Sequence, residues 1–133
     1  MEGYDTYYNF VKGYTGKSVE NVVIAETFEQ DSQTYYTNAI RANAFKNNKT
    51  MTSVEIPAKV IVLEGNVFRG CDNLRTITLK CSELDTVNVF VSFNRILDGL
   101  TPSNITFKVM NNNVKTVIDN LSLGVTVEII SAE

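Results

Sequence analysis

Few residues in this chain could carry out covalent or acid–base chemistry. It has no histidine and only two cysteines, Cys71 and Cys81. Without histidine, a serine or cysteine nucleophile lacks its commonest general base, and two cysteines alone do not complete a structural zinc site. Glu83 and Asp85 lie close together, but on a segment typical of a solvated turn, and there is no Gly-rich phosphate loop. The sequence therefore predicts a protein that is not an enzyme and holds neither metal nor cofactor.

Composition limits the remaining classes of protein. The chain has 133 residues, 44% hydrophobic and 20% charged, which is typical of one folded domain and not of a disordered or membrane-inserted chain. Its net charge is −3 and its 12 basic residues are scattered, which argues against a nucleic-acid partner. Residues 1–10 show no secretory signal pattern, and the cellular compartment stays open.

The chain repeats itself. Residues 40–45 (IRANAF) and 63–68 (LEGNVF) share an aliphatic residue, an Asn two positions before the end and a final Phe, and they lie 23 positions apart. The same offset carries Met51 onto Leu74, Val54 onto Ile77 and Ile56 onto Leu79. A repeated apolar pattern of this length predicts a solenoid, in which each coil stacks on the previous one.

Each unit ends in a segment that alternates apolar and polar residues, as a half-buried strand does. We take five apolar residues, one per segment, as equivalent: Ile24, Ile56, Leu79, Phe107 and Ile129. They are separated by 32, 23, 28 and 22 positions. The pattern therefore predicts a short parallel sheet of about five strands, with insertions in the two longer steps.

The insertions have local explanations. Residues 29–33 are a polar loop of turn-forming types. A short amphipathic helix is expected where Phe90, Phe93, Leu97 and Leu100 recur at helical spacing. A second helix is expected from Val114, Val117, Ile118 and Leu121, with Asn112 or Asn113 as its cap and Gly124 just past its end, before a last strand at 125–130.

With these residues in view, the chain resembles the BspA-type leucine-rich repeats of bacterial and some protozoan surface proteins. Residues 66–79 resemble the family repeat, residues 54–57 its strand ending in Ile-Pro, and residues 13–24 its N-terminal entry. The sequence departs from the family pattern at three positions: Asn48 stands where Cys is common, and Ala25 and Lys80 replace Pro. The resemblance implies a right-handed β/α superhelix and a role in adhesion or protein binding at a cell surface or after secretion.

We expect a single leucine-rich-repeat domain over 1–133, with an N-terminal cap (1–20), repeats (21–109) and a C-terminal helix and strand cap (110–133). The alternate strand residues must then face solvent together on the concave side of the sheet. The candidate binding residues are Val23, Ser53, Glu55, Thr76, Thr78, Lys80, Asn104, Thr106, Lys108 and Glu128, with Thr126 beside them. Among these, Lys80 and Lys108 are expected at strand ends. A flat surface of this kind suits a protein or a glycan better than a small metabolite.

Two alternatives stay open. Thr, Ser and Glu are also common on any solvated strand face, whether or not it binds a partner. If the outward residues bind nothing specific, the chain is a structural spacer or self-assembly unit of a larger repeat protein. The six tyrosines all precede the second strand; they could be binding residues, but Tyr7, Phe10 and Tyr14 more readily cover the exposed end of the solenoid.

Core positions follow from the repeat. Phe45 and Phe68 are expected to fill the space behind the sheet, and Cys71 to point inward as a small hydrophobic residue. If 75–80 is a strand, Cys71 and Cys81 stand on the order of 30 Å apart, well beyond the roughly 7 Å that a disulfide allows between Cα atoms. Both should be free thiols.

Overall fold

The computed structural model describes residues 4–5, 10–11, 19–60, 62–86 and 93–130. The strands are β1 (Tyr4–Asp5), β2 (Phe10–Val11), β3 (Asn21–Val23), β4 (Thr27–Gln30), β5 (Gln33–Tyr36), β6 (Ala39–Ile40), β7 (Ser53–Ile56), β8 (Val62–Leu63), β9 (Thr76–Leu79), β10 (Thr106–Val109) and β11 (Thr126–Ile129). The helices are the 3-10 helices η1 (Phe93–Arg95) and η2 (Pro102–Asn104) and the α-helix α1 (Asn112–Asn120).

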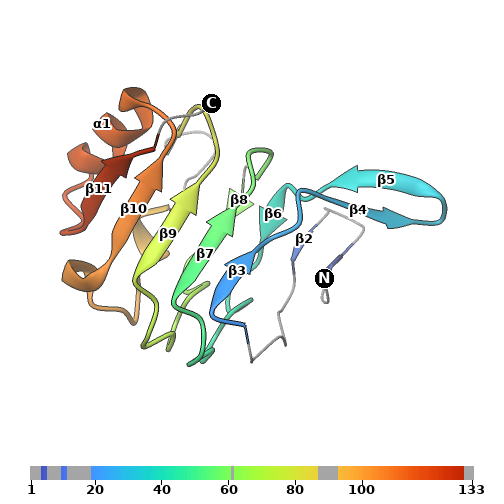
Figure 1. The fold of residues 1–133 in the computed structure, drawn as a ribbon, viewed down its shortest axis with the longest axis horizontal. Helices are drawn as coiled ribbons and strands as arrows, with labels where there is room; N and C mark the ends of the chain where they lie inside the picture. Colours follow the sequence, from blue (N-terminus) through green and yellow to red (C-terminus); the bar gives the residue numbers. More distant parts are fainter. Residues whose placement is uncertain (1–3, 6–9, 12–18, 61, 87–92, 131–133) are drawn as a thin grey trace.

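Five parallel strands form the larger sheet, in the order β11-β10-β9-β7-β3 (Figure 1). Their inward side chains are in register: Val54 of β7 lies opposite Ile77 of β9, Ile77 opposite Phe107 of β10, and Phe107 opposite Val127 of β11. Because side chains alternate across a strand, one face of the sheet is apolar and buried while the other faces solvent. The predicted parallel sheet of about five strands is confirmed.

The sequence alignment of the fourth coil was wrong by two residues. It set Phe107 level with Leu79, but the sheet pairs Leu79 with Val109. Residues 102–104, which include Asn104, form η2 instead of the start of the strand, and the Ile105 backbone N–H donates to the Pro102 carbonyl at 2.9 Å. Proline presets the backbone for such a turn, so the strand begins later than its alternating pattern indicates.

A smaller sheet lies behind the first, in the order β1-β2-β6-β8 (Figure 1). Its strands β6 and β8 are parallel and pair Ile40 with Leu63, which the repeat offset had already matched. Strand β2 continues the sheet beside β6, and β1 pairs with β2 in the antiparallel direction. The sequence reasoning missed this sheet because two-residue strands carry no detectable alternation.

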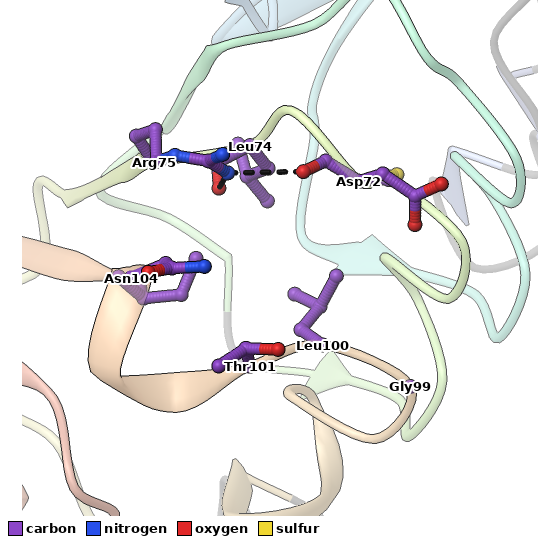
Figure 2. Close-up of a pocket in the computed structure, with 9 residues that line it drawn as sticks. Asp72, Leu74, Arg75, Gly99, Leu100, Thr101 and Asn104 are labelled. Carbon is purple, nitrogen blue, oxygen red and sulfur yellow. Dashed lines mark hydrogen bonds between the residues drawn. The ribbon is translucent and has the colours of Figure 1, made fainter.

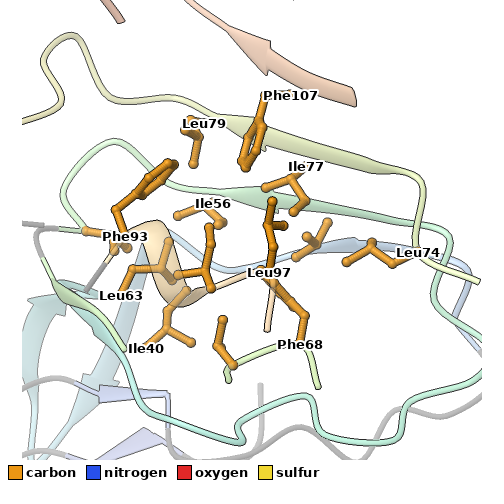
Figure 3. Close-up of a cluster of buried hydrophobic side chains, with 14 of the residues drawn as sticks. Ile40, Ile56, Leu63, Phe68, Leu74, Ile77, Leu79, Phe93, Leu97 and Phe107 are labelled. Atoms are coloured by element: carbon orange, nitrogen blue, oxygen red, sulfur yellow. The ribbon is translucent and has the colours of Figure 1, made fainter. Parts of the chain in front are cut away.

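The core fills the space behind the larger sheet (Figure 3). Phe45 and Phe68 are 1% and 0% exposed, and their rings stack at 5.8 Å between centroids. Phe93 and Phe107 form a second ring pair at 5.7 Å, nearer the C-terminal coils. Both phenylalanines of the repeat therefore lie in the core, as predicted, and their rings stack one coil on the next.

The turns of the two regular coils use left-handed backbone at matching positions. Asn43 and Asn66, the asparagines two residues before the repeat phenylalanines, have φ of 67° and 66°. Asn47 and Gly70 are the next matched pair, at φ 62° and 80°. Asparagine and glycine tolerate this conformation best, which explains why the repeat retains Asn at its first turn position.

Gly70→Ala is expected to lower the free energy of unfolding by about 1 to 2 kcal/mol, because φ is positive there. A Cβ at this position would also stand 2.1 Å from the Asn47 side-chain oxygen and 3.3 Å from its Cα. Urea unfolding measures the change. In an Asn47→Gly background the side-chain clash is gone, so the Gly70→Ala cost should shrink; an unchanged cost would contradict the proposed contact.

The first insertion is a β-hairpin. Strands β4 and β5 pair in the antiparallel direction and project from the solenoid (Figure 1). Asp31 and Ser32 form its two-residue turn with φ of 53° and 65°, so the predicted turn is present but its flanks are strands. Phe28 and Tyr35 lie opposite each other with ring centroids 5.7 Å apart. This aromatic cross-strand pair stabilises the hairpin.

The later insertions differ in part from expectation. Instead of the predicted amphipathic helix, the described part of this segment holds the three-residue η1, with Phe93 and Leu97 buried and Phe90 outside the described residues. The C-terminal helix is present as α1, and Val114 and Ile118 are its buried residues. Its cap is Asn111, not Asn112 or Asn113: the Asn111 side chain accepts from the Val114 N–H at 2.9 Å.

The tyrosines do not act as one group. Tyr7 and Tyr14 lie outside the described residues, so their capping role stays a prediction. Tyr35 and Tyr36 are on the hairpin strand β5, where Tyr36 is 51% exposed. At the N-terminal end, the backbone of β2 pairs with β6, which places residues 10–11 against the first coil.

Candidate interaction surface

The strand register aligns the outward side chains of the larger sheet into two rows. The first outward row consists of Asn21, Ser53, Thr76, Thr106 and Thr126. The second outward row consists of Val23, Glu55, Thr78, Lys108 and Glu128. Neighbouring members of a row are about 4.8 Å apart, the spacing of adjacent strands. The fold thus turns single residues from distant repeats into one continuous surface.

The first outward row is chemically uniform. Four of its five members carry a hydroxyl group, and at the N-terminal end the Ser53 hydroxyl donates to the Asn21 side-chain oxygen at 2.7 Å. Thr76 and Thr106 are half-buried, while Thr126 on the edge strand is exposed. Hydroxyl groups both donate and accept hydrogen bonds, so this row offers a regular array of donors and acceptors.

The second outward row carries the charges. Glu55, Lys108 and Glu128 belong to it, and Lys108 stands directly between Thr78 and Glu128. The sequence reasoning had placed Lys108 at a strand end; the corrected register moves it into the row. At the other end Val23 is 61% exposed, the most exposed large hydrophobic side chain of those described. The row therefore changes from apolar and acidic at β3 and β7 to mixed charge at β10 and β11.

Two of the predicted site residues lie away from these rows. Asn104 lines a polar cavity of about 170 Å³ beside Arg75, Thr101 and Leu100 (Figure 2). One nitrogen of the Arg75 guanidinium, Nη1, donates there to the Asp72 and Leu74 carbonyls at 3.0 and 2.9 Å, which ties the side chain to its own turn. Lys80 follows β9 and lines a different depression.

That second depression, the Pro57 groove, lies at the C-terminal ends of the strands. It has a volume of about 290 Å³ and is lined by Val23, Ile24, Ala25, Glu26, Glu55, Pro57, Ala58 and Lys80. The groove adjoins the second outward row, with which it shares Val23 and Glu55. Nothing in the residue spacing predicted it, because it joins segments more than 50 positions apart; the exposed Val23 was the one available signal.

The two cysteines belong to the core rather than to this surface. Both are free thiols, as predicted, and both are buried, which was predicted for Cys71 alone. The Cys71 thiol donates to the Phe45 carbonyl at 3.0 Å. Burial raises the pKa of Cys71 from 9.0 to about 11, against smaller lowering effects of the Asn48 backbone and the Lys49 charge, and burial also raises the pKa of Cys81.

Cys71 is expected to react with iodoacetamide at pH 8 about a hundredfold more slowly in the folded protein than in urea, since only the thiolate attacks. Because the folded chain holds the Cys71 proton more tightly than the unfolded chain, the free energy of unfolding should fall as the pH rises from 9 to about 11. Mass spectrometry of the labelled peptide measures the rate. Equal rates with and without urea would contradict the buried thiol, and Cys71→Ala should remove its share of the pH dependence.

These features define a class of protein: a solenoid of short repeats, in which each coil adds one strand to a parallel sheet whose outer face is mostly polar. The sequence model of the BspA type leucine rich repeat region (6 copies) matches residues 38–112, more than half of the chain. The chain therefore belongs to the BspA-type leucine-rich-repeat family, whose members are in general non-catalytic and whose repeats suggest a protein-interaction module.

Among solved structures, the chain is similar to a leucine-rich repeat protein from Bacteroides ovatus. The two share 13% sequence identity with a TM-score of 0.44, over 90% of this chain and 28% of the other. The chain thus spans little more than a quarter of that protein's length. No curated protein matches the chain. Within the described residues, no helix is long and apolar enough to cross a membrane.

Proposed function

We propose that the chain is a binding module that holds another protein on the outward face of its larger sheet. The observation that carries this proposal is the common register of the five strands, which lines up the two outward rows as one platform. A flat polar surface with hydrogen-bond donors and acceptors at regular intervals can bind both the main chain and the side chains of a polypeptide. More specifically, we propose that this binding serves adhesion at a cell surface and that the chain catalyses no reaction.

Peptide selection tests the proposal. A phage-displayed library of random linear peptides is selected on the folded chain, and the selected peptides are measured against Thr78→Arg/Thr106→Arg, which changes one residue in each outward row. Affinity should fall by about tenfold or more, as it does when a binding hot spot is lost.

A matched variant separates the face from general effects of charge. Thr34→Arg/Thr116→Arg makes the same chemical change at exposed positions on β5 and α1, away from the outward rows. It should keep full affinity, and circular dichroism should show both variants folded. Equal affinity of the two variants would refute the proposal, and so would a glycan array that yields ligands when the peptide selection yields none.

A structural spacer that self-associates is the second candidate, and one observation favours it. On the edge strand β11, Ile129 points to the core side of the sheet but is 48% exposed, and Val127 is only partly buried. A free strand edge with exposed aliphatic residues readily pairs with another strand. Sedimentation of the wild-type chain and of Ile129→Lys tests this: concentration-dependent association that the substitution abolishes would support the spacer.

A further inference from the structure

The Pro57 groove is an apolar hollow that adjoins the outward face at the C-terminal ends of the strands. Val23, Ala25, Pro57 and Ala58 supply its apolar lining. Val23 and Ala58 are exposed, whereas Pro57 and the lining residue Ile24 are buried, so the groove opens to solvent above a floor that belongs to the core. An exposed apolar hollow beside a polar platform is a typical anchor point for one side chain of a partner.

The groove is held in shape by the base of the hairpin. The buried Thr37 donates its hydroxyl to the Ala25 carbonyl at 2.8 Å and its N–H to the Glu26 carbonyl at 2.9 Å. On the other side, the Val60 N–H closes the turn onto the Pro57 carbonyl at 3.2 Å. Lys59 reaches the hairpin, with its ammonium 5.5 Å from the centre of the Tyr36 ring. Fixed walls reduce the entropy that binding must overcome.

Two of the three departures from the family repeat, Ala25 and Lys80, line the groove. In the register of the sheet they match Pro57, so the same repeat position of three successive coils contributes to the lining. Pro57 keeps the family residue, whereas alanine at 25 leaves more room and lysine at 80 adds one positive charge. The lining holds two carboxylates, Glu26 and Glu55, and one lysine, so it is acidic overall.

From this shape and charge, we infer that the Pro57 groove binds an aliphatic side chain of a polypeptide partner whose next residue is Lys or Arg. The aliphatic side chain packs on Val23, Ala25 and Ala58, and the cation meets Glu26 and Glu55. This inference rests on the proposed function and adds a specificity-determining anchor to it. The outward rows would then carry the rest of the partner, beginning at Val23 and Glu55, which belong to both surfaces.

An NMR titration with synthetic peptides tests the inference. Blocked Gly/Ser peptides carrying a central Leu-Lys or a central Leu-Glu are added separately to the nitrogen-15-labelled chain. The Leu-Lys peptide should shift the backbone amides of residues 23–26, Glu55 and Ala58. The Leu-Glu peptide should bind about tenfold more weakly, because its carboxylate meets two others.

Matched variants assign the binding to the groove. Ala58→Trp fills it and should abolish the shifts, while Ala42→Trp, at an exposed position elsewhere, should leave them unchanged. Glu26→Gln/Glu55→Gln should remove the preference for Leu-Lys, whereas Glu20→Gln/Glu83→Gln, with the same loss of charge at exposed positions outside the groove and the outward rows, should retain it. High salt should weaken Leu-Lys binding in the wild-type chain.

The inference is wrong if the Leu-Lys peptide shifts none of these amides, or if it binds Ala58→Trp as well as the wild type. This result is separable from failure of the proposed function. Library-selected peptides that depend on Thr78 and Thr106 but bind Ala58→Trp normally would refute the groove and leave the platform standing. Peptides that need neither surface would refute both.

Discussion

Phe68→Ala lowers the free energy of unfolding by about 3 to 5 kcal/mol, the usual cost of removing a large ring from a core that cannot collapse around the gap. Phe68 is completely buried and stacks on Phe45 of the preceding coil, 5.8 Å away between ring centroids. Its loss therefore removes contacts within its own coil and between coils. Urea unfolding followed by circular dichroism measures the change.

Phe28→Ala is the matched control, because it removes the same atoms from the projecting hairpin. Phe28 is partly exposed, and its ring stacks on that of Tyr35 across the hairpin. Its truncation should cost about 1 kcal/mol, the value of one aromatic pair. If Phe28→Ala and Phe68→Ala lowered the free energy of unfolding equally, the stacking of Phe68 between the coils would stabilise the fold no more than an aromatic pair on the hairpin does.

Much of the fold could be predicted because repeated coils repeat their side-chain requirements. Ile40 and Leu63, matched by sequence offset, are direct partners in the smaller sheet, and Phe45 and Phe68 stack on each other. Asn43 and Asn66 share a left-handed backbone. Matched positions of successive coils have the same packing environment and therefore carry the same residue types. Because the coils stack, two residues matched by the 23-residue offset are also neighbours in space.

Prediction failed where an insertion changed the path of the chain between coils. Residues 104–107 alternate in the same way as a strand, but the turn at Pro102 shifts the strand to 106–109. The polar stretch 29–33 includes the hairpin turn, whose stability depends on Phe28 and Tyr35 on its flanks. In both places a local turn, and not the alternation of the strand, decides the structure.

The candidate site was predicted in part for the same reason. Alternation alone identified Ser53, Glu55, Thr76 and Thr78 as outward residues, and the sheet aligns them as two rows. Asn104 fell outside because the register shifted, and Lys108 moved in. The Pro57 groove could not be predicted, since its shape depends on where the hairpin leaves the solenoid.

Ile77→Asp and Thr78→Asp place the same carboxylate at adjacent positions of β9 and should have opposite outcomes. Ile77 is 0% exposed and lies between Val54 and Phe107 in the centre of the inward face. A carboxylate there has no cation opposite it in the register, and the cost of burying it is several kcal/mol beyond the lost packing. That cost is a large share of the total stability of a small domain, about 5 to 15 kcal/mol.

Thr78→Asp should change the free energy of unfolding by less than about 1 kcal/mol, because its side chain faces solvent, and the attraction of Lys108 on one neighbouring strand offsets the repulsion of Glu55 on the other. Circular dichroism and urea unfolding of the two variants make the comparison. Ile77→Asp should fail to give a cooperative transition, while Thr78→Asp should unfold like the wild type. Similar stability of the two variants would mean that the strand does not separate a buried face from a solvated one, and the outward rows could not then serve as a binding platform.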